Sequence, residues 1–541
     1  MSIILGITGG LSHTGQDASV AIIQNSELVF AMEEERFTRQ KHSRGVMPTN
    51  AITKGLNFIQ KSIKDVEYVA YYANYFKIKD DLVRYFKHNF GYSPKILFYD
   101  HHMCHAASAF FPSKFEKSLI FTADYSGDGV STTVSIGNGK NIETVKRYKK
   151  PNSLGIFYSM FTQILGFEFD NDEYKVMGLA PYGKNKIDLN KFIQTDRSGD
   201  YKLNYKYLNL NNRSRQDTLY NDKFISELNL SSKFKYNNIT QKQKDIAFSV
   251  QSKLEEIIVN LIINFQKKYK INNLCMAGGV SLNCAVVRKI SQLNIFKNIF
   301  VQPASSDAGA ALGAAILANI EKFNKFKKVK NHVYLGNQYN KNEIKYFLKK
   351  CNIKYTKLNQ NNLKNFISEK ISKDFVFGIF KGRHEYGPRA LGNRSILANP
   401  KNKNMKSILN HKIKFREGFR PFAPVVMQKN ASKFFDLRLS PENYKHMTIN
   451  VSSFEKTKKY FPSCVHVDGT SRVQILNKKD NVFIYEILSC LDRDFDINCL
   501  INTSFNLNKM PIVNTPQDAL SCFFGSGLDY LVLEDYLIEK N

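Results

Sequence analysis

Residues 118–137, SLIFTADYSGDGVSTTVSIG, carry the pattern that decides the fold of this chain. An apolar run is followed by a turn with Asp124, Asp128 and glycines and then by a second apolar run, which predicts two β-strands joined by a turn. The same pattern occurs near the N-terminus, where IILGITGG (residues 3–10) is followed by Asp17 and further apolar runs. Two such units indicate a duplicated fold that holds phosphates between facing hairpins, because backbone N–H groups in these turns bind anions. An ordinary Asp-Gly hairpin in each place is the simpler alternative.

A second fold signal lies farther along, where a helix, a strand and two glycines follow one another. Apolar residues recur at helical spacing from Ile246 to Phe265 and predict a long amphipathic helix. A strand over 273–277 then ends at Gly278-Gly279, and a helix is expected to begin near Ser281. This arrangement lets an anionic or flat ligand approach the backbone closely, whereas tight packing alone is the structural alternative.

The composition is that of a globular protein. The chain has 541 residues, 43% hydrophobic and 23% charged, and this length favours roughly two to four domains. Its 78 basic and 48 acidic residues give a net charge of +30. The excess suggests nucleic acid, an anionic membrane or phosphorylated small molecules as partners, although solvated surface lysines explain much of it equally well.

The main domain boundary is expected near residue 335, with one domain over 1–335 and a second over 336–541. A fresh strand is predicted at His332–Leu335, after a lysine-rich stretch. The polar segment 184–244 has weak periodicity and is interpreted as an insertion or a lid.

Cysteine usage and hydropathy bear on the compartment. The eight cysteines form no C-x-x-C pair, which argues against a zinc ribbon or a thioredoxin-type site. The N-terminus lacks the basic and apolar regions of a signal peptide, and the apolar run 308–320 is too short to cross a bilayer. We therefore expect a reduced, cytoplasmic protein without a membrane partner.

The segment DHHMCHAASAFFPS (100–113) holds a candidate metal site. On a helix His101 and His105 lie one turn apart on the same face, as two imidazoles must to bind one ion. Asp124, at the end of a strand, and Asp307, at the start of a small-residue helix, are candidate further ligands, and imidazole with carboxylate suits Fe, Mn or Zn. A structural or surface role for the two histidines is the alternative.

The densest basic cluster lies between Arg383 and Arg420. It contains ten basic residues, five of them arginine, against the two acids Glu385 and Glu417. Because guanidinium groups bind phosphate oxygens in pairs, this cluster is where we expect a phosphorylated substrate. A solvated surface and an RNA-binding face are the alternatives, but no aromatic pattern of the RNA-recognition type accompanies it.

With these residues identified, the chain resembles the O-carbamoyltransferases of the NodU/CmcH type. The matching segments run in the family's order over nearly the whole chain and leave mainly the polar insertion uncovered. They are ILGITGG…QDASVAII, AMEEERFTRQKH, HHMCHAASAF, TADYSGDG, VMGLAPYG, GGVSLNCAV, SSDAGAALGAA, GRHEYGPRALGNRSILANP, IKFREGFRPFAPVV, HVDGTSRVQ and NTSFN…PIV.

The resemblance implies an α/β and α+β protein with an N-terminal domain like those of actin and the sugar kinases and a C-terminal YrdC-like domain. It implies that carbamoyl phosphate and ATP, with Mg, give a carbamoyl-adenylate at the C-terminal domain. The N-terminal domain, with a divalent metal for which Fe is the first choice, would then transfer the carbamoyl group to a hydroxyl group. The acceptor is expected to be a hydroxylated small molecule and not a nucleic acid, and a homodimeric state is left open.

When the family's functional residues are carried over to the matching positions of this chain, the resemblance implies three sets of site residues. The metal ligands are His101, His105, Asp124 and Asp307. The nucleotide, carbamoyl phosphate and ATP site contains Gly278, Gly279, Asn283, Arg389, Arg394, Ser395, Lys414, Arg416, Arg420, Asn502 and Ser504. The candidate catalytic residues are His13, Asp17, Arg389 and Lys414.

The sequence departs from the family pattern in two places. Gln16 stands where the family commonly has a histidine, and because glutamine is no general base, His13 is the candidate substitute. Lys509-Met510 replaces the usual Gly-Glu. Two other functions stay open: a tRNA threonylcarbamoyladenosine-type enzyme, which usually has its two folds on separate chains, and a non-enzymatic actin-like nucleotide-binding scaffold.

Overall fold

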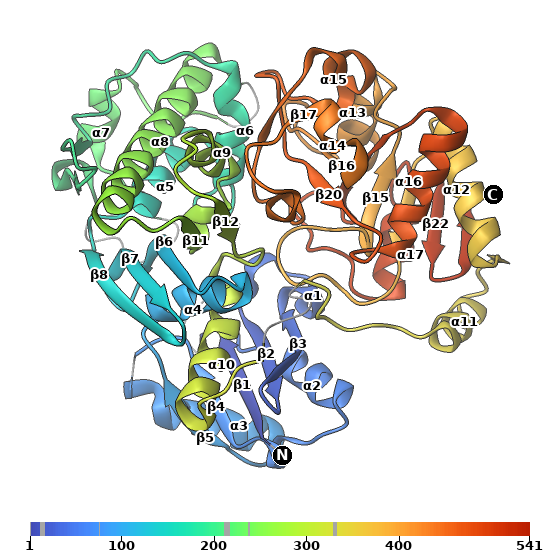
Figure 1. Cartoon of the computed structure of the whole chain (residues 1–541), viewed down its shortest axis with the longest axis horizontal. Helices are drawn as coiled ribbons and strands as arrows, with labels where there is room; N and C mark the ends of the chain where they lie inside the picture. Colours follow the sequence, from blue (N-terminus) through green and yellow to red (C-terminus); the bar gives the residue numbers. More distant parts are fainter. Residues whose placement is uncertain are drawn as a thin grey trace. The chain divides into compact units, whose positions relative to one another are not determined.

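The computed structural model describes residues 2–10, 17–74, 76–209, 217–235, 239–327 and 333–540. Two compact units make up the chain: Met1–Pro112 with Gln302–Asn541, and Ser113–Val301 (Figure 1). Both units mix helices with strands, which agrees with the expected α/β and α+β class. These units divide the chain differently from the boundary expected near 335, which stays a prediction.

The first unit begins with a five-stranded sheet of order β3-β2-β1-β4-β5. Its central strand β1 pairs antiparallel with β2 and parallel with β4, and the outer strands continue these directions. The strands are β1 Ile3–Thr8, β2 Ser19–Gln24, β3 Glu27–Glu33, β4 Tyr68–Tyr71 and β5 Lys95–Phe98. The helices of this part are α1 Glu35–Thr38, α2 Thr49–Phe58, α3 Lys79–Phe90, α4 His101–Ser113 and α10 Asp307–Phe323.

The second unit contains a sheet with the same plan, of order β12-β11-β6-β7-β8. Its central strand β6 pairs antiparallel with β7 and parallel with β11, as β1 does with β2 and β4. The strands are β6 Lys117–Gly127, β7 Val130–Asn138, β8 Asn141–Lys149, β11 Asn273–Ala277 and β12 Asn298–Val301. The repeated strand–turn–strand unit predicted from residues 118–137 is therefore confirmed.

The helices of the second unit follow their sequence signals closely. Helix α8 runs from Gln241 to Tyr269, and a reciprocal hydrogen-bonded cap between Thr240 and Gln243 fixes its start. The predicted helix after the glycine pair begins at Cys284, because residues Gly279–Leu282 first make a 3₁₀ turn. The other elements are α5 Leu154–Ile164, α6 Glu173–Leu179, β9 Ile193–Thr195, β10 Tyr201–Leu203, α7 Asp222–Glu227 and α9 Cys284–Gln292.

An eight-stranded sheet of order β13-β23-β22-β14-β15-β21-β16-β20 forms the C-terminal part of the first unit. Helices α12 and α16 pack on it through a shared apolar core. The strands are β13 Thr356–Lys357, β14 Phe377–Phe380, β15 Arg394–Ala398, β16 Ala423–Met427, β20 Gln474–Leu476, β21 Cys499–Ser504, β22 Tyr530–Leu533 and β23 Tyr536–Glu539; a small sheet holds β17 Phe435–Asp436, β18 Val451–Ser453 and β19 Thr470–Ser471. The helices are α11 Lys341–Lys350, α12 Gln360–Ser372, α13 Met405–Ile408, α14 Gln428–Phe434, α15 Glu455–Tyr460, α16 Val482–Phe495 and α17 Pro516–Phe524.

The strand predicted at 332–335 is wrong for its described residues. Residues 333–335 form no strand, and Tyr334 makes only an isolated bridge with Glu385. A short apolar run bounded by polar residues cannot distinguish a strand from a connecting segment. Within the described residues, none of the helices is both long and apolar enough to pass through a bilayer.

Small residues bring helix α10 against both β1 and α4. A Cβ atom at Gly6 would overlap the Ala311 carbonyl oxygen of α10, and one at Gly313 would overlap the Cys104 carbonyl oxygen of α4. Because both positions lack a side chain, the backbones approach closely. This packing places the first turn of α10 beside the first turns of α4, which is the basis of the site described next.

Candidate functional site

Two buried imidazoles stand at the start of α4. Asp100 caps this helix, since its Oδ1 accepts a hydrogen bond from the Met103 backbone N–H. His101 and His105 follow one turn apart, and their Nε2 atoms are 3.1 Å from each other. Their exposed fractions are only 4% and 0%, which is unusual for such polar side chains.

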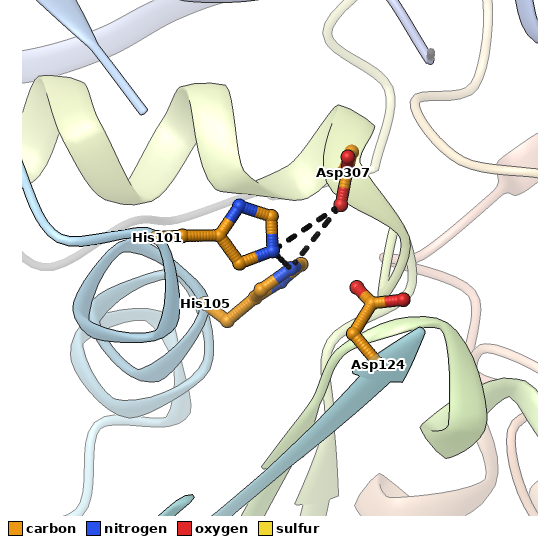
Figure 2. Close-up of side chains that lie close together, drawn as sticks. All are labelled: His101, His105, Asp124 and Asp307. Carbon is orange, nitrogen blue, oxygen red and sulfur yellow. Dashed lines mark hydrogen bonds and ion pairs between the residues drawn. The ribbon is translucent and has the colours of Figure 1, made fainter. Parts of the chain in front are cut away.

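The carboxylate of Asp307 completes a group of three. Figure 2 shows both imidazoles pointing toward it from α4, while Asp307 itself begins α10. Its Oδ1 lies 3.6 Å from His101 Nε2 and 3.4 Å from His105 Nε2. The three ligand atoms lie within 4.8 Å of one another, a set of nitrogen and oxygen donors that suits a divalent metal. The structure thus brings three of the four predicted ligands together in the first unit.

Asp124 stands in the second unit, on β6, next to the glycine pair. Its Oδ1 accepts a hydrogen bond from the Tyr125 backbone N–H. Gly278 has a φ of 87°, and a Cβ there would overlap the Ala123 carbonyl oxygen, so tight packing accounts for this glycine. A Cβ at Gly279 would come within 3.1 Å of Asp124 Oδ1. The predicted nucleotide residues Gly278 and Gly279 therefore lie against the end of β6.

The third predicted nucleotide residue of this unit, Asn283, already has protein partners. Its Oδ1 caps α9 by accepting from the Val286 backbone N–H, and its Nδ2 donates to Gln251 Oε1 at 2.9 Å. Its observed contacts are those of a helix cap, and its predicted role at a nucleotide stays a prediction.

In the C-terminal part, Lys414 is a buried ammonium among neutral oxygens. It is 2% exposed, and its Nζ donates to the backbone carbonyls of Ser504 at 2.6 Å and Asn506 at 2.9 Å. All of its hydrogen-bond partners in the described part of the chain are oxygens of these two residues, and none is a carboxylate. Burial, reinforced by the nearby Arg416, holds the pKa of Lys414 well below its usual range. A bound anion would relieve this penalty.

Strand pairing brings three other predicted residues, Ser395, Asn502 and Ser504, into one region of the sheet. Ser395 of β15 lies opposite Ser504 of β21, and Leu397 lies opposite Asn502. The side chain of Asn502 donates to Gln474 Oε1 at 2.8 Å, and Ser395 Oγ accepts from the Gly392 backbone N–H at 2.9 Å.

Arg394, also on β15, is completely buried. Its Nη1 donates to backbone carbonyls such as that of Lys381, and its guanidinium lies 3.6 Å from the centre of the Phe380 ring. Its Nε and Nη2 find no hydrogen-bond partner among the described residues. Burial lowers the pKa of Arg394 to about 10, despite the opposing attraction of Glu385. Two unsatisfied guanidinium nitrogens in the interior are the kind of donors an anion or ordered water would satisfy.

The remaining predicted arginines differ in their contacts. Arg416 donates from Nε to Asn410 Oδ1 at 2.7 Å, and Arg420 Nη1 lies 3.6 Å from Glu417 Oε2. Arg389 is half-buried. Together with Lys414, Arg416 supports a basic site here, since it is one of the charges that depress the Lys414 pKa.

At the N-terminal end, His13 and Gln16 lie outside the described residues. Asp17 is described, and it contacts His42. Asp17 has a left-handed φ of 50°, and its backbone N–H donates to the His42 carbonyl at 2.7 Å. Its Oδ1 lies 2.6 Å from His42 Nδ1. Burial alone would lower the His42 pKa, but the Asp17 carboxylate outweighs it and raises the pKa to about 9.

His42 is a residue that the sequence analysis did not single out as functional. It lies in AMEEERFTRQKH, a segment used there only as part of the resemblance. Its partner Asp17 is 25 positions away in sequence, so no local spacing joins the two. A histidine at the end of a charged segment is the only signal the sequence offers.

Comparison with known proteins gives the family. The model of the carbamoyltransferase N-terminus matches residues 55–316, and that of the carbamoyltransferase C-terminus matches residues 368–540. An uncharacterised protein of Synechocystis is 32% identical over 98% of this chain and 96% of its own length. Nodulation protein NolNO of Sinorhizobium fredii is 32% identical over 99% of this chain and 82% of its own length.

Among solved structures, HypF of T. kodakarensis is similar at 12% identity and a TM-score of 0.34, over 60% of this chain and 49% of that chain. A likeness this distant has no bearing on fold or ligand. The two family models and the relatives that match most of the chain identify its family without the solved structures. The chain belongs to the carbamoyltransferase family of the NodU and NolO type, and it is an enzyme that transfers carbamoyl groups.

Proposed function

We propose that this carbamoyltransferase is ATP-dependent and acts in two stages. Carbamoyl phosphate and ATP, with Mg, give a carbamoyl-adenylate at a YrdC-like C-terminal domain, and the carbamoyl group is then transferred to a hydroxyl of a small molecule. The transfer stage belongs to an N-terminal domain of the actin and sugar-kinase type. The observation that carries the proposal is the convergence of His101, His105 and Asp307 on one point.

These three residues are suited to hold a divalent metal, and the donor set fits Fe, Mn or Zn. The imidazole Nε2 atoms face each other in a buried site where water is scarce, and the carboxylate supplies negative charge beside them. Asp124, within β6 in the TADYSGDG segment, is proposed as a fourth ligand on the basis of the family resemblance. A metal bound here would act as a Lewis acid toward the carbamoyl group and the attacking hydroxyl.

The C-terminal residues support the activation stage. Lys414 is desolvated, and no carboxylate among the described residues pairs with it, so a phosphate near Nζ would gain favourable electrostatic attraction. Arg416 adds positive charge nearby, and Arg394 holds buried guanidinium nitrogens without partners in the described part of the chain. We assign carbamoyl phosphate and the ATP phosphates to this group, together with Arg389, Arg420, Ser395, Asn502 and Ser504.

The chemistry requires such an arrangement. A carbamate is a weak acylating agent, and joining it to AMP as a mixed anhydride supplies a good leaving group. Buried cations stabilise the negative charge that develops on the phosphates, since they act where water is excluded. We further propose a cytoplasmic location and no nucleic-acid partner.

One assay tests the proposal. The purified chain is incubated with ATP, Mg and carbamoyl phosphate, and pyrophosphate and phosphate release are measured. We expect pyrophosphate release that depends on carbamoyl phosphate. Its absence, with the protein folded and metal-loaded, would contradict the adenylate route.

The ligand assignment is tested separately with His101→Ala and His105→Ala, against His88→Ala on the exposed face of α3. Metal content measured by plasma mass spectrometry should fall in the first two variants and stay unchanged in the third. Full metal content in both ligand variants would remove the assignment.

A further inference from the structure

Asp17 and His42 form a hydrogen-bonded pair that has no role in the two-stage reaction described above. The His42 Nδ1 atom lies 2.6 Å from Asp17 Oδ1, and the Asp17 backbone N–H donates to the His42 carbonyl at 2.7 Å. Both residues adopt left-handed backbone conformations, with φ of 50° and 65°, and neither is glycine. Such conformations cost energy and collect at functional sites. The contact is thus held from the backbone as well as from the side chains.

Hydrogen bonds connect this pair to the start of α10, where Asp307 lies. Thr8 Oγ1 donates to the Asp17 carbonyl at 2.8 Å and also contacts Ser19 Oγ at 3.2 Å. Ser19 Oγ in turn donates to the Ala308 carbonyl at 2.7 Å. The Tyr386 hydroxyl donates to the same carbonyl. Asp17 is therefore fixed to the helix turn that carries the carboxylate of the candidate metal site.

Three charged residues act on the imidazole of His42. Its backbone N–H donates to Glu35 Oε2 at 2.7 Å, and Lys41 precedes it. Asp17 and Glu35 favour the imidazolium form and Lys41 opposes it. Asp17 provides the largest favourable contribution, so the pair is an imidazolium–carboxylate pair at neutral pH.

We propose that His42 is a positioning residue of the carbamoyl transfer: it fixes the Asp17 carboxylate to receive the proton of the acceptor hydroxyl. The inference rests on the proposed function. In the transfer, the hydroxyl oxygen forms a bond to the carbamoyl carbon and the bond from that carbon to the adenylate phosphate oxygen breaks. AMP leaves with the electron pair, and the hydroxyl proton passes to Asp17.

Two physical effects follow from His42. A hydrogen bond from Nδ1 to Oδ1 restricts the orientation of the carboxylate relative to the acceptor hydroxyl. The imidazolium also compensates the Asp17 charge, so an anionic adenylate can approach without repulsion. This arrangement would supply a proton acceptor in a chain that has Gln16 in place of the family's histidine.

The test compares His42→Asn with His42→Gln in the full-length chain. Asparagine puts an amide N–H near the position of Nδ1 and tolerates a left-handed φ, whereas glutamine puts it near the position of Nε2. Activation is read as carbamoyl-phosphate-dependent pyrophosphate release, and transfer as radiolabelled carbamoyl appearing on methyl α-D-glucopyranoside. We expect activation within about twofold of wild type in both variants and transfer reduced roughly 10- to 100-fold in His42→Gln, with partial retention in His42→Asn.

The pH dependence gives a readout that a purely structural role would not change. Transfer by the wild type should decline as the pH rises through about 9, where the imidazolium is lost, and this decline should be absent in His42→Asn. Equal transfer by wild type and His42→Gln, or an equal loss of activation and transfer, would overturn the inference. Absence of pyrophosphate release in the wild type would instead contradict the proposed function.

A side-chain NMR titration of ¹⁵N-histidine-labelled protein decides the pairing without any acceptor. The His42 signal is assigned by its loss in His42→Asn, with His88→Asn as the matched exposed control. We expect a His42 pKa near 9 in the wild type and a large fall in Asp17→Asn, because burial then lowers the pKa without the Asp17 charge to oppose it. An ordinary pKa in the wild type would overturn the pair, whatever the transfer assay shows.

Discussion

Replacing Gly313 by alanine should disrupt the candidate metal site without touching a ligand. The new Cβ would overlap the Cys104 carbonyl oxygen in α4, three residues after His101 and next to His105. Because the obstacle is backbone and not a flexible side chain, α4 and α10 must separate, by a distance on the order of 1 Å in a close-packed interior. Asp307 begins α10, so the separation moves it away from both imidazoles.

The expected size of the effect follows from this geometry. Metal–ligand distances tolerate only about 0.2 Å, so the shift should weaken metal binding at least as much as the loss of a supporting residue, roughly 10- to 100-fold. Overpacking costs about 1–3 kcal/mol of unfolding free energy, offset by up to about 1 kcal/mol because alanine favours a helix. The variant should therefore stay folded while it loses metal.

The assay measures Mn²⁺ or Zn²⁺ affinity by chelator competition, together with urea unfolding. Ile316→Val is the matched control, because Ile316 is fully buried in the same helix and its truncation costs about 0.5–1.5 kcal/mol without separating the two helices. The control should bind metal like wild type. Unchanged metal affinity in a folded Gly313→Ala variant would refute the reasoning that close packing of α10 on α4 builds the site.

Three further predictions concern buried and half-buried charges. Lys414→Met should lower carbamoyl-phosphate-dependent pyrophosphate release by about 10²-fold. Because the Lys414 pKa is lower in the folded protein than in the unfolded chain, the stability of the wild type relative to the variant, measured by urea unfolding, should rise as the pH approaches 10.5. Arg36→Met should cost about 3–5 kcal/mol of unfolding free energy, because Arg36 Nη2 lies 3.2 Å from the buried Glu33 Oε1, and the double variant with Glu33→Gln should recover much of it. His42 has a raised pKa, so its contribution, at most about 3 kcal/mol, is complete below pH 6.5 and is lost as the pH rises through about 9; a flat difference between wild type and His42→Asn over this range would contradict it.

Much of the fold could be predicted because the informative signals are local. The apolar periodicity from Ile246 to Phe265 and the Thr240–Gln243 cap both lie within α8. Strand β11 ends where the glycine pair begins, since Gly278 adopts a φ that other residues avoid. The prediction of a strand at 333–335 was wrong for the opposite reason. Its apolar run is short, and its conformation depends on residues far along the chain, such as Glu385 and Tyr386.

The site shows the same division between local and distant information. His101 and His105 could be paired from sequence because one helical turn separates them. The resemblance suggested Asp307, but its approach to them depends on Gly313, whose role appears only when α10 is packed on α4. The pair of Asp17 and His42 could not be predicted, because it requires two left-handed residues from separate segments to meet.

The net charge of +30 illustrates why burial, and not the number of charges, indicates where an anion binds. An exposed lysine such as Lys373 pairs with Glu369 on its own helix, where water screens the interaction. The Lys414 ammonium instead donates to neutral oxygens. Its pKa is depressed because burial removes water from the charged form. An unfavourable buried charge of this kind is retained where a ligand of opposite sign compensates it, and this supports our proposal of a phosphate site at the ends of β15 and β21 instead of on the lysine-rich surface.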